Sequence, residues 1–201
     1  MGNQQIREPK QQRSIEKRGR IVEAGYELFC EKGYYNTNTA EIAKLAGVST
    51  GIVYSYFKDK KDIFMIVVEE YANKVATPIY DILKPLKKPV DIEMTVRKII
   101  HALTVSHTMV KSVHEEMEAL AHTDEDISNI LYRFQARNAK NLVSLMENLG
   151  IRPTNAYEKV HLILDMIENL SHEILYRKHE YLDYDVMTDE AVKVIVTMLS
   201  T

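Results

Sequence analysis

The chain has little of what secreted, disulfide-linked and membrane-spanning proteins depend on. It contains one cysteine, Cys30, and no tryptophan among its 201 residues, which excludes a disulfide framework within the chain. We expect Cys30 to be either a buried structural thiol or a redox sensor. The first residues lack the apolar segment of a signal peptide, and no apolar run reaches the roughly 18 residues that span a membrane. These absences predict a cytoplasmic protein with no membrane partner.

Sequence motifs typical of catalytic and cofactor-binding sites are missing as well. The sequence has no glycine-rich phosphate loop, no nucleophile elbow, no HExxH zinc motif and no convincing pair of catalytic carboxylates. Strands are not indicated either, because no alternation of apolar and polar residues reaches a useful length. Apolar residues recur at helical spacing instead, and their 45% share is ample for a core. We therefore expect an all-α protein of about nine helices that is not an enzyme and needs no cofactor.

The most informative stretch is residues 38–57, NTAEIAKLAGVSTGIVYSYF. Its first half predicts a short helix that Asn38 can cap, because Glu41 three positions on can complete a capping box. Gly47 then stands where the end of a helix favours the left-handed conformation. This half therefore predicts a helix followed by a tight turn.

The second half of the stretch predicts another short helix, which Ser49 can cap. Val53 and Phe57 lie four residues apart and are expected to point inward. Small, hydroxyl-bearing and tyrosine side chains remain on the outer surfaces. Because a short helix with such a face fits the major groove, we interpret the stretch as a DNA-binding helix-turn-helix.

This stretch and its flanks resemble the TetR family of transcriptional regulators over about a quarter of the chain, from Arg18 to Phe64. The residues that carry the resemblance are Ile21, Leu28, Phe29, Glu31, Lys32, Gly33, Tyr34, Thr37, Glu41, Ile42, Ala43, Ala46, Gly47, Val48, Ser49, Gly51, Tyr54, Tyr56, Phe57 and Lys60. Two positions depart from the family pattern. Gly25 lies within a helix, at a cost of about 1 kcal/mol relative to alanine, and is expected to allow close helix packing. Ala40 replaces a basic or polar residue, so no phosphate contact is assigned to it.

The resemblance implies a set of DNA contacts. Thr50, Gly51 and Ile52 would meet base edges or the neighbouring backbone. Tyr54, Tyr56 and Lys60 would bind phosphates, and the helix starts near Thr39 and Ser49 would add amide donors. The full predicted DNA-binding set is Thr39, Ser49, Thr50, Gly51, Ile52, Tyr54, Ser55, Tyr56 and Lys60. Either tyrosine could instead pack in the core of the small domain, and Lys61 is expected to be solvated.

The charge is divided unevenly along the chain. The formal net charge is −3, but residues 1–62 hold 11 basic and 8 acidic side chains, whereas residues 63–201 hold 15 and 21. Positive charge therefore gathers next to the motif, where DNA phosphates would lie, and acidic surface is kept away from it. For residues 1–12 taken alone, a solvated basic tail explains the charge as well.

We expect three parts in the chain: a flexible basic arm of residues 1–13, a helix-turn-helix domain of residues 14–62, and a helical effector-binding and dimerisation domain of residues 63–201. The helices outside the motif are expected at about 14–32, 59–77, from 91 onward, 112–121, 123–149, 154–179 and 188–200. Pro78 is expected to end or kink the fourth helix, and Ser112 with Glu115 to form a capping box.

The last two helices predict the dimer interface. The final helix is apolar almost all round, and so wide an apolar surface needs partners on more than one side. We expect these helices to pair with their copies across a two-fold axis, as the resemblance also implies. The predicted interface residues are Ile163, Ile167, Leu170, Ile174, Ile195, Met198 and Leu199.

The effector site is weakly marked. A pocket for a small hydrophobic or amphipathic effector could be lined by Met94, Thr104, His107, Met117, Phe134, Met146 and Met166. Methionine at helical spacing is more often part of a core, so that alternative stays open.

A histidine pattern raises the question of a metal. His114, Glu118 and His122 recur every four residues, and His107 lies seven residues upstream. Two histidines and a carboxylate on one helix face could bind zinc. Histidines on a solvated helix face explain the pattern more simply, so no metal site is predicted.

Three classes of function remain open. The favoured one is a homodimeric repressor that a small-molecule ligand releases from a palindromic operator. The second is a DNA-binding protein of the same shape that answers to a protein partner or to its own concentration. The third is a helical enzyme or carrier that happens to contain a helix-turn-helix, and it lacks any chemical motif to support it.

Overall fold

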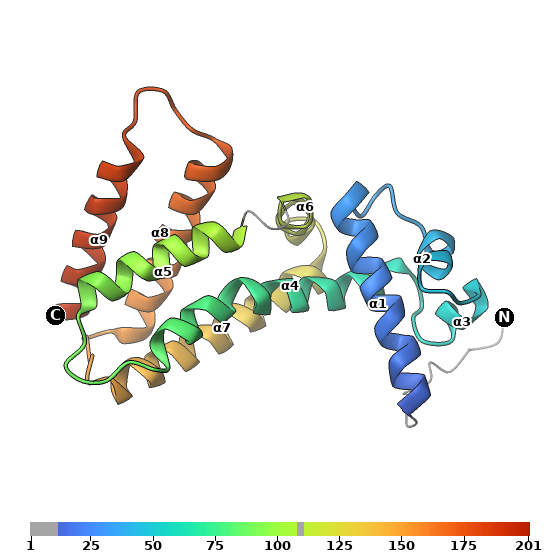
Figure 1. The fold of residues 1–201 in the computed structure, drawn as a ribbon, viewed down its shortest axis with the longest axis horizontal. Coiled ribbons are helices and arrows are strands. Elements are labelled where there is room, and N and C mark those ends of the chain that lie inside the picture. The colour runs from blue at the N-terminus through green and yellow to red at the C-terminus, as the bar shows by residue number, and fades with distance from the viewer. Residues whose placement is uncertain (1–11, 108–110) are drawn as a thin grey trace. The chain divides into compact units, whose positions relative to one another are not determined.

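The computed structural model describes residues 12–107 and 111–201, and every regular element in these ranges is a helix (Figure 1). The prediction of an all-α fold is therefore confirmed. The nine helices of the described ranges are α1 (Gln12–Lys32), α2 (Thr39–Leu45), α3 (Thr50–Tyr54), α4 (Lys60–Leu83), α5 (Ile92–His107), α6 (Lys111–Ala121), α7 (Glu125–Asn148), α8 (Ala156–Tyr176) and α9 (Tyr184–Ser200). Within the same ranges, none of the helices has both the length and the apolar character needed to cross a membrane.

The chain forms two compact units that alternate along the sequence. The first unit comprises the residues up to Tyr71 together with 110–131, and the second comprises 72–109 and 132–201. The chain passes from the first unit to the second within α4, and does so again within α7. The domain boundaries predicted after residues 13 and 62 stay a prediction, and α6 groups with the N-terminal helices. The predicted arm of residues 1–13 lies outside the described residues, apart from 12 and 13, which begin α1.

An aromatic core holds the first unit together. The rings of Phe29 on α1 and Phe64 on α4 meet edge to face with their centres 5.1 Å apart. At Gly25, the absent side chain lets α1 approach α4 closely, because a methyl group there would come within 2.6 Å of Cγ2 of Ile63. The close packing expected at Gly25 is confirmed. Cys30, on the same helix, is half-buried.

The second unit is built around α5, α8 and α9, which pack against one another (Figure 1). Its core is aliphatic. The buried residues at its centre are Ile79, Leu83, Val96, Ile100, Leu103, Leu142, Val143, Met146, Val160, Ile163, Ile167, Leu170, Val192 and Ile195. Because these residues come from helices distant in sequence, the unit depends on long-range apolar contacts.

Two helix boundaries differ from the prediction by four residues or more. α4 does not end near Thr77 but continues through Pro78 to Leu83, because Ile79 and Leu83 are buried one turn apart and extend its apolar stripe beyond the proline. α9 begins four residues before the expected start, because Asp183 caps it by accepting hydrogen bonds from the backbone N–H groups of Asp185 and Val186. Ser112 lies inside α6, and its side chain is outside the described residues, as is the capping box predicted for it.

Candidate nucleic-acid interface

The start of α2 carries the predicted capping box. Oδ1 of Asn38 accepts a hydrogen bond from the backbone N–H of Glu41 at 3.0 Å, and the Glu41 carboxylate accepts one from the backbone N–H of Asn38 at 3.2 Å. Glu41 also pairs with the ammonium of Lys32 at 2.6 Å. This hydrogen bond from Lys32, and the one from the Asn38 backbone, hold the pKa of Glu41 below its usual value. Reciprocal bonds and an ion pair thus fix where α2 begins.

The turn between α2 and α3 has the predicted geometry. Gly47 adopts the left-handed conformation with φ 66°, which residues with a side chain rarely adopt. The backbone N–H of Val48 returns to the carbonyl of Ala43 at 3.0 Å. Ser49 then caps α3 by accepting a hydrogen bond from the N–H of Ile52 at 3.4 Å.

α3 has a buried and an exposed side. Val53 is fully buried, and Phe57, just beyond the helix, is nearly so. On the opposite side, Gly51, Tyr54 and Ser55 are exposed, and Thr50 and Ile52 are half-buried. A methyl group added at Gly51 would meet only Oγ of Ser49, at 4.0 Å, among the described residues. The packing of the protein therefore does not require glycine at this position.

Tyr56 is placed differently from Tyr54. The Tyr56 hydroxyl lies 2.7 Å from Oγ of Ser14 and hydrogen-bonds to it, which ties the residues after α3 to the start of α1. Tyr54 is 44% exposed. Of the two predicted phosphate ligands, Tyr54 presents its ring to solvent, whereas Tyr56 already has a partner for its hydroxyl within the unit.

Lys60 has a role that sequence reasoning missed. Its ammonium donates hydrogen bonds to the carbonyls of Tyr34 at 2.6 Å and of Thr37 at 2.9 Å, and lies 4.3 Å from the centre of the Tyr34 ring. Burial lowers the pKa of Lys60. These carbonyls follow the end of α1, where a cation is favourable. The side chain therefore stabilises the α1–α2 connection, and its phosphate contact stays a prediction.

Basic residues of α1 lie beside the motif. The guanidinium of Arg18 lies 5.3 Å from the centre of the Phe57 ring. The Arg20 guanidinium would be 3.7 Å from a methyl group at Gly47, in the turn before α3. These two arginines supply part of the positive charge that the sequence predicts next to the motif. Thr39, the first residue of α2, is half-buried.

The corner between α6 and α7 is bound to the helices of the same unit. The ammonium of Lys61 pairs with the carboxylates of Asp124 and Asp126, each at 2.7 Å, and the hydrogen bonds that it donates to both raise the pKa of Lys61. The expectation of a solvated Lys61 is therefore wrong. Glu116 on α6 accepts a hydrogen bond from the backbone N–H of Tyr34. No local signal in the sequence points to these pairs, because their partners lie more than 60 residues apart.

The residues predicted for the dimer interface differ in how deeply they are buried. Ile163, Ile167, Leu170 and Ile195 are at most 9% exposed within the single chain, so they contribute to the core of the second unit. The other three, Ile174, Met198 and Leu199, are half-buried. The helical stripe was recognised correctly, but both sides of α8 and α9 are apolar, and periodicity alone does not tell which side faces inward.

The residues predicted for the effector pocket are dispersed. Among the members of this set whose side chains are described, Met146 alone lines a cavity of about 80 Å³ in the second unit. Met94 is half exposed, Met117 is buried in the first unit, and the hydroxyl of Thr104 hydrogen-bonds with that of Ser171 at 3.0 Å. Phe134 and Met166 are half-buried. The side chain of His107 lies outside the described residues.

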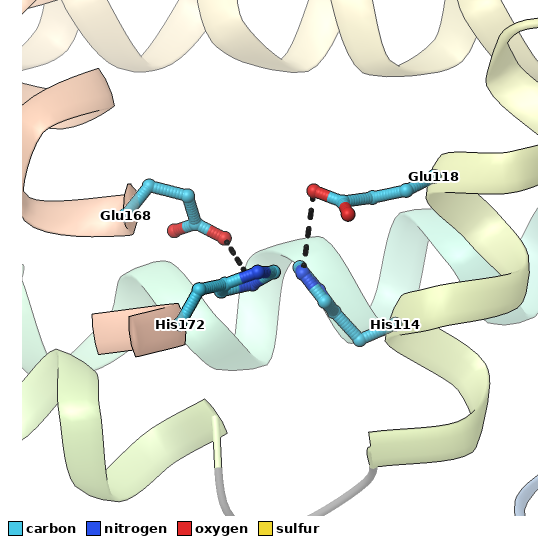
Figure 2. A group of neighbouring side chains, drawn as sticks. All are labelled: His114, Glu118, Glu168 and His172. Atoms are coloured by element: carbon cyan, nitrogen blue, oxygen red, sulfur yellow. Dashed lines mark ion pairs between the residues drawn. The ribbon is translucent and has the colours of Figure 1, made fainter. Parts of the chain in front are cut away.

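The histidine pattern on α6 is not a solvated face, because His114 is buried against the ring of Tyr71. Its Nε2 lies 3.4 Å from Oε1 of Glu118 one turn later, and His122 is exposed. α8 carries a pair of the same kind, in which Nε2 of His172 lies 3.5 Å from Oε1 of Glu168 (Figure 2). The absence of a metal site remains a prediction.

Comparison with known proteins agrees with this geometry. The model of the bacterial regulatory proteins of the tetR family matches residues 21–65. The HTH-type transcriptional regulator HbdR of Aromatoleum sp. is 26% identical over 176 residues, which cover 84% of this chain and 72% of that protein.

Solved structures share the fold. A protein from Mesorhizobium loti described as a TetR-family transcriptional regulator has a TM-score of 0.72 at 21% identity, covering 94% of this chain and 98% of that one. A transcriptional regulator from Saccharomonospora viridis in complex with choline has a TM-score of 0.68 at 18% identity, with coverages of 90% and 96%. The relatives are regulators of transcription rather than enzymes. Residues 21–65 thus form the helix-turn-helix domain of the tetR family of bacterial regulatory proteins, and the chain shares its fold along most of its length with TetR-family transcriptional regulators.

Proposed function

We propose that the protein is a homodimeric repressor that binds a palindromic operator in the cytoplasm and leaves it when a small molecule binds the second unit. The observation that supports DNA recognition most directly is the outer side of α3. It combines an exposed glycine, which lets a backbone approach closely, with exposed hydroxyl groups. Capping at both motif helices holds this side in a fixed orientation within the unit.

A second copy of the chain gives the binding its specificity. One five-residue helix contacts few bases, whereas two copies about 34 Å apart read both halves of a palindrome. On α8 and α9, the exposed large apolar residues are Tyr157, Leu162, Val186 and Val194. Met166 and Met198 follow Leu162 and Val194 one helical turn later. We propose that this face pairs with its copy in a four-helix interface, with Ile174, Met198 and Leu199 at its border.

Release from the operator requires a ligand that prefers the state of the dimer in which the spacing of the two recognition helices does not match the operator. Such a ligand lowers DNA affinity by its differential affinity for the two states. The choline complex of the Saccharomonospora viridis regulator supports a small-molecule effector, since that protein shares the fold. The second unit, which holds a cavity, is the proposed location.

The test is fluorescence anisotropy with duplexes from the DNA that flanks the coding region. We expect binding of two chains per palindrome, and weaker binding by Gly51→Ala and by Tyr54→Phe. Tyr181→Phe is the matched control, since Tyr181 is a tyrosine outside the motif that is 80% exposed. A single subunit that binds the same site with undiminished affinity would contradict the dimeric mechanism.

A further inference from the structure

The cavity in the second unit has a wall of unusual composition. It lies where the C-terminal half of α4, the start of α5, the end of α7, and α8 and α9 come together, and Leu83, Val96, Met146, Val160 and Ile195 are among its lining residues. Among the described residues, none exposes a polar atom on this wall. Thr95 is the one lining residue with a hydroxyl, and that hydroxyl donates a hydrogen bond to the carbonyl of Asp91 at 2.6 Å.

The wall excludes several kinds of ligand. No aromatic ring of the described residues lines the cavity, so a quaternary ammonium group finds no cation–π partner there. No charged side chain of the described part lines it either, so a charged group would lose its hydration without compensation. The part of a ligand that enters must therefore be hydrocarbon.

The size of the cavity further limits which ligand groups can enter it. Its volume is about 80 Å³. An apolar cavity that takes up benzene is about 150 Å³ in volume. An aromatic ring is therefore too large, whereas the end of an unbranched alkyl chain fits.

A lysine lies beside two chain segments that contribute to this wall. A methyl group at Gly150 would be 3.2 Å from Cε and 3.4 Å from Nζ of Lys88, so the Lys88 side chain extends over Gly150. The next residue, Ile151, lines the cavity, as does Val90, two residues after Lys88. The Lys88 side chain is exposed. An anionic group at the outer end of a bound chain would meet this positive charge.

We propose that the second unit binds a short, unbranched aliphatic carboxylate, with the alkyl end in the cavity and the carboxylate at Lys88. This inference deepens the proposed function, on which it rests only for the consequence that binding releases DNA. The site takes up the thin end of a chain and discriminates against rings and against cationic head groups.

Isothermal titration calorimetry of the full chain without DNA tests the proposal, with butanoate, pentanoate and hexanoate as probes. We expect affinity to rise about fourfold for each added methylene that the cavity holds. Benzoate and choline are expected to bind at least tenfold more weakly than hexanoate. Equal or tighter binding of benzoate or choline would overturn the ligand class, and so would failure of all three carboxylates to bind.

Two pairs of variants locate the site. Val96→Ile with Val160→Ile fills the cavity with two methylene groups, and we expect it to weaken hexanoate binding at least tenfold. Val143→Ile, in the same core but outside the cavity, is the matched control. Should the double variant lose its cooperative melting transition, Val160→Ile alone replaces it. Unchanged binding in a folded filled variant would place the ligand elsewhere and refute the proposal.

Lys88→Gln is expected to reduce the affinity for hexanoate severalfold and to leave that for hexanol unchanged. Lys84→Gln is the control on the same segment. Equal loss with both alcohols and acids, or none with either, would remove Lys88 as the anchor. Operator release is measured separately by anisotropy. Hexanoate that binds without releasing DNA contradicts the proposed repressor function and leaves the carboxylate site standing.

Discussion

Both units have an apolar core, but bonds between side chains and nearby backbone groups are most prominent in the helix-turn-helix of the first. In the first unit, side chains bond to nearby backbone groups, as Asn38 and Ser49 do at the starts of α2 and α3. In the second, aliphatic residues from distant helices, such as Ile100, Ile167 and Ile195, share one core. Directional bonds fix orientation, whereas apolar packing tolerates change of shape provided that volume is conserved. The unit that reads DNA is therefore specified by geometry, and the unit proposed to bind the effector by volume.

The largest effect is expected from Ile195→Ala, which tests whether the second unit depends on packing within a single chain. Ile195 is fully buried, so loss of its side chain should lower the free energy of unfolding by about 2–5 kcal/mol. Urea denaturation at two protein concentrations measures it. Leu162→Ala is the control, since Leu162 is 57% exposed within the chain.

If both residues lie where we propose, Ile195→Ala destabilises equally at either concentration, and Leu162→Ala acts chiefly by shifting the monomer–dimer equilibrium. An Ile195→Ala variant whose loss of stability disappears at high concentration would show that Ile195 contributes to the subunit interface instead.

A smaller effect is expected from Lys60→Gln in the first unit. The charged hydrogen bonds to the carbonyls of Tyr34 and Thr37 are lost, which should cost about 1–2 kcal/mol for a half-buried group. Lys58→Gln, at an exposed position nearby, should change stability by less than about 0.5 kcal/mol. Urea denaturation gives both values. Wild-type stability combined with a flatter salt dependence of operator binding would instead assign the Lys60 ammonium to a phosphate.

The sequence predicted the local features of the first unit better than the long-range packing of the second. The capping box at Asn38, the left-handed Gly47 and the inward Val53 were predictable, because each depends on residues within a few positions of one another. The buried sides of α8 and α9 were not, because both helices are apolar on more than one side and their neighbours come from elsewhere in the chain. For the same reason the cavity was missed, as its wall combines five helices and one predicted pocket residue, Met146. The contact of Glu116 with the α1–α2 connection was equally invisible, since it links positions 82 residues apart.

Two glycines of α1 offer a matched pair with opposite expected signs. Gly25→Ala places a methyl group 2.6 Å from Cγ2 of Ile63, and the strain of overpacking, about 1–3 kcal/mol, exceeds the gain in helix propensity of about 1 kcal/mol. For Gly19→Ala, the new methyl group has no neighbour within 4 Å among the described residues, so the gain should appear almost undiminished. Thermal melting of both variants measures the difference. A stabilised Gly25→Ala would mean that α1 and α4 separate at little cost.

The smallest effect on stability is expected from removing one helix cap in each unit. Asn38→Ala and Asp183→Ala each remove a side-chain acceptor at a helix start, with an expected loss of about 1 kcal/mol in either case. α2 has seven residues and α9 has 17, and a short helix is less able to survive the loss of a cap because nucleation is costly. Amide hydrogen exchange should therefore accelerate throughout α2 in Asn38→Ala, but only in the first turn of α9 in Asp183→Ala.

The two cap variants are also expected to differ in their affinity for the operator. α2 packs directly against α3, so Asn38→Ala should weaken DNA binding beyond its effect on global stability, whereas Asp183→Ala should not. Equal affinities for the two variants would show that packing of α2 and α3 on α1 is enough to hold the recognition helix. In that case the contrast between a unit fixed by directional bonds and a unit fixed by apolar volume would no longer hold.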